Sequence, residues 1–207
     1  DVQEYRQYIL ADQQHQLWEK YVALNKTVSH PNIVFAGDSI TEYFPIHELL
    51  TSTVPLYNRG VHGIDSLQFL EHLSSQILDL APSKVFLLIG VNDLKKRTPE
   101  EVCQTIQSII TKIHQQLPET QIFLLSVFPM NESPEFVRTP SLRNNQSISL
   151  LNDNLSRLAG DEVRWIDVHD LLCDETGQLK RDWTVDGLHL TVAGYRVIAD
   201  AIQPYLV

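Results

Sequence analysis

The chain has 207 residues, 43% of them hydrophobic and 20% charged, with a formal net charge of −10 at pH 7. This length predicts a single domain, residues 1–207, with enough apolar surface for its own core. The acidic balance argues against a nucleic-acid partner, because binding to phosphates needs Lys and Arg. No apolar stretch approaches the ~20 residues of a membrane span, and the N-terminus does not resemble a signal peptide, so we expect a cytoplasmic protein.

The first expected element is a helix over residues 2–24. Five apolar side chains fall on one side of it: Tyr5, Ile9, Leu17, Trp18 and Tyr21. A stripe of this kind usually faces a protein core. We therefore expect this helix to pack on a sheet rather than to bind a partner.

Five short apolar runs with β-branched and aromatic residues are predicted as strands: residues 33–36, 55–57, 85–89, 122–127 and 163–166. Helical patterns separate them, and strands that alternate with helices predict a parallel sheet. The expected fold class is a three-layer α/β/α sandwich, with a flavodoxin-like five-stranded parallel sheet of order 2-1-3-4-5.

The helices between the strands are visible by their period. Leu67, Leu70, Leu73, Ile77 and Leu80 form one apolar stripe, and a second consists of Val102, Ile106, Ile109, Ile110 and Ile113. The second helix has a clear beginning, with Thr98 as N-cap, Pro99 in the first turn and Glu101 three residues after the cap. A last helix is expected over residues 191–205.

Residues 130–140 form the one long expected loop, and a substrate lid and a plain surface connection are both open for it. Cys103 and Cys173 are expected as free thiols. The histidines and cysteines show no metal-ligand spacing. The sequence therefore predicts neither a metal nor a cofactor.

Three polar or glycine segments follow predicted strands: Gly37-Asp38-Ser39, Gly60, and Gly90-Val91-Asn92-Asp93. Strand ends are where open α/β sheets place their sites, and with strand one between strands two and three these segments would converge. Ser39 could then act as a nucleophile, with its N–H, the Gly60 N–H and the Asn92 amide stabilising negative charge. Each also has a plain structural reading: an N-cap for Ser39, a positive φ for Gly60 and a turn for Asn92.

A fourth segment, Asp186-Gly187-Leu188-His189, offers a histidine with a carboxylate three residues before it. The carboxylate could fix the tautomer of the imidazole, which could then take the proton of Ser39. His62, and His169 beside Asp167 and Asp170, are rivals for this role. We favour His189, because it combines a nearby carboxylate with a following helix.

These four segments resemble the SGNH hydrolases, also called the GDSL esterase/lipase family, in which Ser, Gly, Asn and His occur in this order. The resemblance spans nearly the whole chain. It implies Ser39, Asp186 and His189 as the catalytic triad, and Ser39, Gly60 and Asn92 as the oxyanion hole. Asp38 and Asp93 would support the turns around them.

Small departures from the family are the GDSI form of the first segment and Leu190-Thr191 after His189. The His-Leu-Thr form and Leu142-Arg143-Asn144 are similar to intracellular platelet-activating-factor acetylhydrolase catalytic subunits. The resemblance implies hydrolysis of a small-molecule, lipid or carbohydrate ester, without a cofactor, through an acyl-enzyme. A thioesterase, a sugar deacetylase, a lysophospholipase, a non-catalytic binding protein and a flavodoxin-like FMN module remain alternatives, and a homodimer is open.

Two further features touch on the substrate. Lys95-Lys96-Arg97 could attract an anionic leaving group, although a basic run is more often a solvated surface. Phe44, Val91 and Leu188 could line an apolar acyl pocket, or simply pack in the core.

Overall fold

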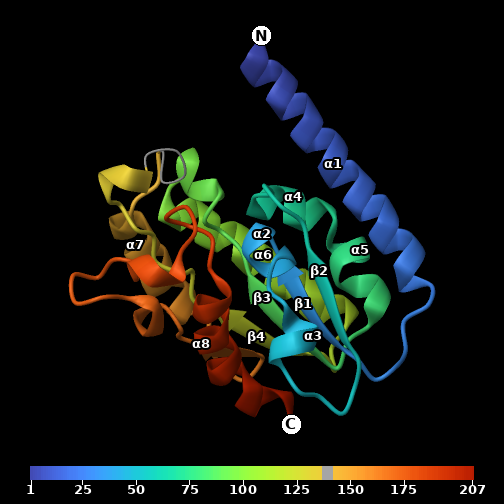
Figure 1. Ribbon diagram of the computed structural model, residues 1–207. Coiled ribbons are helices and arrows are strands. Elements are labelled where there is room, and N and C mark those ends of the chain that lie inside the picture. Colours follow the sequence, from blue (N-terminus) through green and yellow to red (C-terminus); the bar gives the residue numbers. More distant parts are fainter. Residues whose placement is uncertain (137–141) are drawn as a thin grey trace.

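The computed structural model describes residues 1–136 and 142–207. Its centre is a sheet of five parallel strands in the order β2-β1-β3-β4-β5, as predicted from the sequence (Figure 1). The strands are β1 (Ile33–Gly37), β2 (Leu56–Gly60), β3 (Lys84–Leu88), β4 (Gln121–Leu125) and β5 (Val163–Ile166). The predicted bounds shift by at most a few residues.

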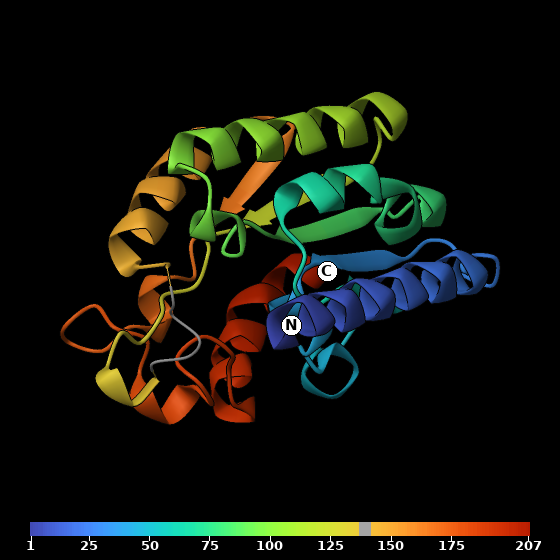
Figure 2. The same ribbon diagram turned by 90° about the horizontal axis from the view of Figure 1, so that it is seen from above.

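Helices cover both faces of the sheet, with α4 and α6 on one side and α8 on the other (Figure 2). The α-helices are α1 (Val2–Asn25), α2 (Ser39–Glu42), α3 (Ile46–Leu49), α4 (Ser66–Glu71), α5 (Leu73–Gln76), α6 (Pro99–Gln116), α7 (Asn145–Ser156) and α8 (Val192–Ile202). The 3-10 helices are η1 (Leu78–Leu80), η2 (Asp93–Lys95), η3 (Pro134–Phe136), η4 (Asp170–Leu172), η5 (Arg181–Trp183) and η6 (Gln203–Leu206). This layering confirms the expected α/β/α sandwich.

Aromatic side chains on neighbouring strands stack along one face of the sheet. Phe35 of β1 lies 4.8 Å from Phe86 of β3, and Phe86 lies 4.7 Å from Phe123 of β4, between ring centroids. All three are buried. Offset aromatic pairs add about 0.5–1.5 kcal/mol each beyond the burial of their area, so this row ties the three central strands together.

The helix α6 agrees with the prediction. Thr98 accepts the Glu101 N–H and Glu101 accepts the Thr98 N–H, which is a capping box, and Pro99 is in the first turn. The predicted stripe from Val102 to Ile113 is buried. At the end of the chain, Thr191 caps α8, which stops at Ile202, and the 3-10 helix η6 follows it.

The stripe from Leu67 to Leu80 belongs to three short helices, and the expectation of one helix is wrong. The helical path breaks at His72 (φ −113°, ψ 21°) and again at Ile77 (φ −141°, ψ −58°). The breaks let the His72 ring stack on Trp18 of α1, with 3.5 Å between ring centroids. Leu73, Ile77 and Leu80 are still fully buried, whereas Leu67 is 44% exposed.

The packing expected for the first helix is also only partly correct. The N-terminal half of α1 extends beyond the rest of the molecule, and Tyr5 is 65% exposed (Figure 1). The C-terminal half contacts α5 and η1, with Trp18 and Tyr21 buried. Two polar contacts add to this packing: the Tyr21 hydroxyl donates to the Gly60 carbonyl at the end of β2, and Trp18 Nε1 donates to Gln76 of α5.

Among residues 1–136 and 142–207, no helix combines the length and the apolar character that crossing a membrane requires.

Candidate active site

The serine stands at the carboxyl end of β1, where the chain turns into α2. Asp38 is the N-cap of this helix, and its Oδ1 accepts the Ile40 N–H at 2.9 Å. Ser39 is therefore the first helical residue and not the cap. Its own N–H lies in the first turn, where helices lack internal acceptors, and the residue is 7% exposed.

The imidazole of His189 connects this serine to a carboxylate. His189 Nε2 lies 2.9 Å from Ser39 Oγ, and His189 Nδ1 lies 2.6 Å from Asp186 Oδ2. The other oxygen of Asp186 accepts the N–H groups of Leu188 and His189 at 3.0 and 2.8 Å. The three side chains predicted from the sequence thus form one continuous hydrogen-bonded line.

The segment that carries Asp186 and His189 is a tight loop before α8. Thr184 Oγ1 accepts the Gly187 N–H at 2.9 Å and donates to the His189 carbonyl at 2.8 Å. Gly187 has φ +93°, and a Cβ there would lie 2.8 Å from Cβ of Phe136. Only glycine fits such a position without strain, so this loop depends on Gly187.

The two acidic residues of the site have opposite shifts in pKa. Partial burial would raise the pKa of Asp186, but hydrogen bonds from the His189 side chain and from the N–H groups of His189 and Leu188 lower it to about 2. Asp38 is buried, and burial raises its pKa to about 7, against the hydrogen bond from Ile40 and the charges of His189 and Arg143. Asp186 is therefore the ionised partner of the histidine at neutral pH.

Asn92 follows β3, and both the nitrogen and the oxygen of its side-chain amide form hydrogen bonds. Its Nδ2 donates to the Ile64 carbonyl at 3.0 Å, and its Oδ1 accepts from Arg143 Nη1 at 3.0 Å. One amide hydrogen is left for a ligand. Arg143 was noted in the sequence only as part of a subgroup resemblance, because nothing in its spacing links position 143 to position 92.

Asp93, the next residue, holds the same loop in place through three hydrogen bonds. Its carboxylate accepts the Ser66 N–H at 2.9 Å, the Ser66 hydroxyl at 2.6 Å and Arg97 Nη1 at 3.0 Å. Burial raises the pKa of Asp93. Arg97 also donates to Thr105 and to the Glu101 carbonyl, so it is a structural residue and not a free cation at the substrate side.

Gly60 ends β2 and packs tightly under α2. A Cβ at this position would lie 2.1 Å from the Glu42 nitrogen, so close approach rather than a positive φ explains the glycine. The Gly60 N–H donates to Asn58 Oδ1 at 3.0 Å. The donor expected for an oxyanion is thus bonded within the protein in this conformation.

Gly63, three residues later, has an N–H with no hydrogen-bond partner in the described part of the chain. Its φ is +77°. The next residue, Ile64, receives the Asn92 amide. Sequence reasoning missed Gly63, although glycine in a turn after a strand was the available signal.

The two rival histidines have other partners. His62 Nδ1 lies 2.8 Å from Glu42 Oε1, and His169 Nδ1 lies 2.7 Å from Asp170 Oδ1. In the described part of the chain, His169, Asp170 and Cys173 form a group that could hold a metal ion, with ligand atoms within 4.8 Å of one another. The sequence reasoning did not identify this group. Burial and nearby acids raise the pKa of Cys173 to about 11, which disfavours the thiolate that binds metals.

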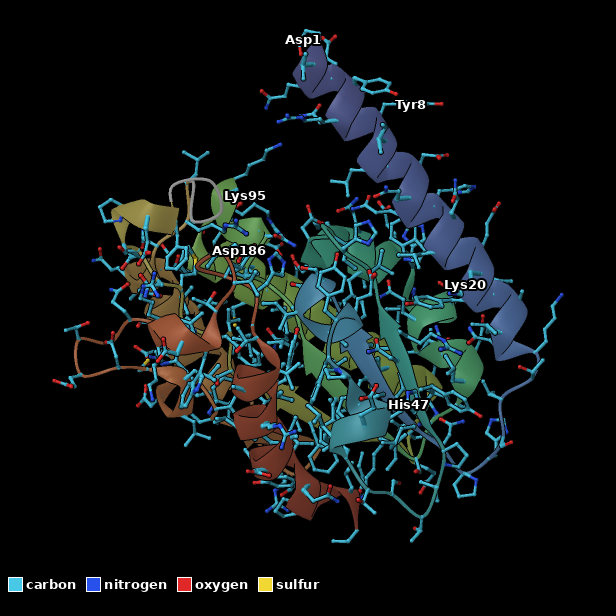
Figure 3. All side chains as sticks on the ribbon, viewed as in Figure 1. Asp1, Tyr8, Lys20, His47, Lys95 and Asp186 are labelled. Atoms are coloured by element: carbon cyan, nitrogen blue, oxygen red, sulfur yellow. The ribbon has the colours of Figure 1, made fainter. Side chains whose placement is uncertain are left out.

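Lys95 and its basic neighbours lie at the edge of the site. Lys95 and Asp186 lie at the same end of the molecule (Figure 3). Lys95 is exposed, but partial desolvation and the neighbouring charges of Arg143 and Lys96 lower its pKa. Of the loop predicted over residues 130–140, residues 137–140 lie outside the described residues. Asn131 and Phe136 contact the Asp186 loop through Gly187.

The expected acyl-pocket residues Phe44, Val91 and Leu188 are all buried in the hydrophobic core. Phe44 stacks on Tyr195 at 5.1 Å. A hollow of about 1050 Å³ lies at the opposite edge of the sheet, beside the first residues of β3, β4 and β5. It does not contain the residues of the candidate site.

Known proteins resemble this chain in sequence. Residues 35–197 match the family described as GDSL-like Lipase/Acylhydrolase. The chain is 27% identical over 177 residues to platelet-activating factor acetylhydrolase IB subunit alpha2 of Rattus norvegicus, with coverage of 84% of this chain and 75% of that one.

Solved structures are similar as well. A protein from Streptococcus pneumonia, provisionally described as a platelet activating factor, has a TM-score of 0.95 and 36% identity, over 100% of this chain and 98% of that one. A GDSL-like lipase from Bacteroides thetaiotaomicron has the same fold, with a TM-score of 0.79 and 23% identity, over 91% and 96% of the two chains.

Proposed function

This chain belongs to the GDSL-like lipase/acylhydrolase family and is a hydrolase of ester bonds, and from that premise we propose that it is a serine esterase with Ser39, His189 and Asp186 as its triad. One observation carries the proposal: His189 Nε2 stands 2.9 Å from Ser39 Oγ while its Nδ1 stands 2.6 Å from Asp186. This is the arrangement that a histidine needs to act as a general base.

In the proposed reaction His189 takes the proton of Ser39 as Oγ attacks the ester carbonyl. The tetrahedral intermediate collapses to an acyl-enzyme and releases the alcohol, which receives the proton from His189. Water activated by the same histidine then attacks the acyl-enzyme and releases the acid. Asp186, ionised at neutral pH, holds the Nδ1 proton and stabilises the imidazolium.

Negative charge on the carbonyl oxygen needs preorganised donors. We expect the Ser39 N–H and the free amide hydrogen of Asn92 to supply two of them. The sequence pointed to the Gly60 N–H as the third, but that group donates to Asn58. The uncommitted N–H of Gly63, beside the Ile64 carbonyl that Asn92 binds, is the better candidate.

The substrate we propose is an ester with a short acyl group. This extends the name of the acetylhydrolase relative to the present chain. A thioester, an acetylated sugar or a lysophospholipid would use the same chemistry. The flavodoxin-like alternative loses its basis, because residues 35–197 match a family of hydrolases and the helix of residues 39–42 is capped by a buried acid.

The test is turnover of p-nitrophenyl acetate, butyrate and octanoate, with fluorophosphonate labelling in parallel. Ser39→Ala should lose both, whereas Ser108→Ala, an exposed serine on α6, should keep both. A folded wild type that neither turns over nor labels would favour a non-catalytic binding protein. A structure of the labelled enzyme would show whether Gly60 or Gly63 faces the phosphonyl oxygen.

A further inference from the structure

The turn His62–Gly63 is held by side chains from two helices. The His62 N–H donates to Glu42 Oε1 at 2.7 Å, and the His62 ring nitrogen Nδ1 lies 2.8 Å from the same oxygen. The His62 carbonyl accepts from Gln14 Nε2 of α1 at 2.9 Å. Both backbone groups of His62 are therefore bound by side chains and not by the sheet.

The contact from α1 is built into the structure rather than incidental. Gln14 is only 4% exposed, although glutamine is normally a surface residue. Its Oε1 also accepts from Gln68 at 3.4 Å, and the adjacent Gln13 lies 3.0 Å from His62 Nε2. Burying a long polar side chain costs rotamer entropy, which these bonds offset.

The bond from Gln14 determines where the next N–H points. The His62 carbonyl and the Gly63 N–H belong to one peptide group, which is planar and, when trans, points its C=O and N–H in opposite directions. Since the carbonyl faces Gln14, the Gly63 N–H faces away from α1. Glu42 fixes the other side of the same turn, and it ends the helix that Ser39 begins.

We propose that Gln14, Glu42 and His62 are positioning residues for catalysis: they orient the Gly63 peptide so that its N–H can donate to the oxyanion. None of them touches the reacting atoms. The inference rests on the proposed serine-esterase function. In this proposal α1 contributes to the reaction as well as to the fold, through the hydrogen bond from Gln14 to the turn His62–Gly63.

The main test is Gln14→Leu, which keeps the volume and removes the donor. Displacing a group by about 1 Å can cost up to 10²-fold in rate, so kcat should fall by about tenfold or more, with KM within about twofold of wild type because the loss is confined to the transition state. The matched control is Gln203→Leu. Gln203, in the 3-10 helix η6 at the end of the chain, also donates to a backbone carbonyl, that of Thr51 at 2.7 Å. The kcat of Gln203→Leu should therefore not change.

A second pair of variants keeps the inference testable if Gln14→Leu does not fold. Glu42→Gln retains an acceptor for the His62 N–H and should keep most of the activity, whereas Glu42→Ala should lower kcat. Equal activities for these two variants, or a folded Gln14→Leu with wild-type kcat, would overturn the positioning role. If Ser39→Ala is inactive in the same assays, only this inference fails; an active Ser39→Ala rejects the serine mechanism itself.

Discussion

The imidazole of His189 meets the hydroxyl of Ser39 at 2.9 Å across 150 positions of the chain. Two separate structures bring them together: the end of β1 fixes the serine, and the loop before α8 fixes the histidine. A further bond joins the two regions, since the Tyr195 hydroxyl of α8 donates to the Ile40 carbonyl of α2 at 2.7 Å. The pair is therefore held by the packing of α8 on the sheet and not by local sequence.

Asp186→Asn should leave the fold intact and remove most of the activity. The amide oxygen can still accept the backbone N–H groups of Leu188 and His189, but an amide no longer stabilises the required tautomer and the imidazolium. We expect kcat to fall by about 10⁴. Asp182→Asn, a nearby exposed acid with the same change of charge, is the control in steady-state assays. A fall of less than tenfold for Asp186→Asn would remove this residue from the triad.

Asn92→Ala tests the oxyanion donor. Loss of one such donor should lower kcat by about 10²–10³. Because Arg143 donates to the same side chain, Asn92→Asp is also needed: it keeps an acceptor for Arg143 but has no donor. Both variants should be similarly impaired with p-nitrophenyl acetate, and an active Asn92→Asp would show that the arginine contact is what matters.

Asp38→Asn should change how stability depends on pH. The pKa of the Asp38 carboxyl is about 7 in the folded protein and 3.8 in its reference state. Between these values the unfolded chain has released its proton while the folded protein still holds it, so the contribution of Asp38 to stability falls as pH rises from about 4 to 7. Asparagine can still cap α2 but does not titrate.

The stability of the wild type relative to Asp38→Asn should therefore be greatest near pH 4 and decrease up to pH 7. Urea unfolding of both proteins at pH 4.5 and pH 8 measures this. If the difference in unfolding free energy between the two proteins were the same at pH 4.5 and pH 8, Asp38 would titrate near its usual pKa.

Asp93→Ala should destabilise the fold. The Asp93 side chain is fully buried and pairs with Arg97, and removing one partner of a buried pair typically costs about 3–5 kcal/mol. The midpoint of urea unfolding should fall accordingly. Arg181→Ala, which breaks the exposed pair with Glu135, should leave the midpoint unchanged. Equal effects of the two variants would contradict the structural role of Asp93.

The sequence was sufficient for the strand order and for the line from Ser39 to Asp186. Local signals gave the strands themselves, as short β-branched runs, and the pair of Asp186 and His189, three residues apart. The strand order and the pairing of His189 with Ser39 came from the expected fold class and from the family resemblance. Arg143 and Gln14 could not be found in this way. Each reaches its partner through a contact that depends on how distant elements pack, and an isolated arginine or glutamine has no spacing to reveal it.

The departures in the helices have a similar origin. The period of Leu67 to Leu80 fits one helix, but the tertiary contact between His72 and Trp18 favours a break. For α1, the stripe of apolar residues predicts burial over its whole length, whereas the body of the protein reaches only its C-terminal half. The prediction for Gly60 failed to anticipate that Asn58, two residues earlier, accepts its N–H.

The register of the central strands limits which changes of length the protein can tolerate. Gly37 pairs with Gly60 on one side and with Leu88 on the other, so the segments that carry Ser39, Gly63 and Asn92 leave the sheet from the same rung. A single-residue insertion in β1 would move its end by about 3.3 Å and reverse which face each side chain occupies. Insertions in the loops at the amino ends of the strands are free of this restriction. Fusions or labels are therefore best attached there.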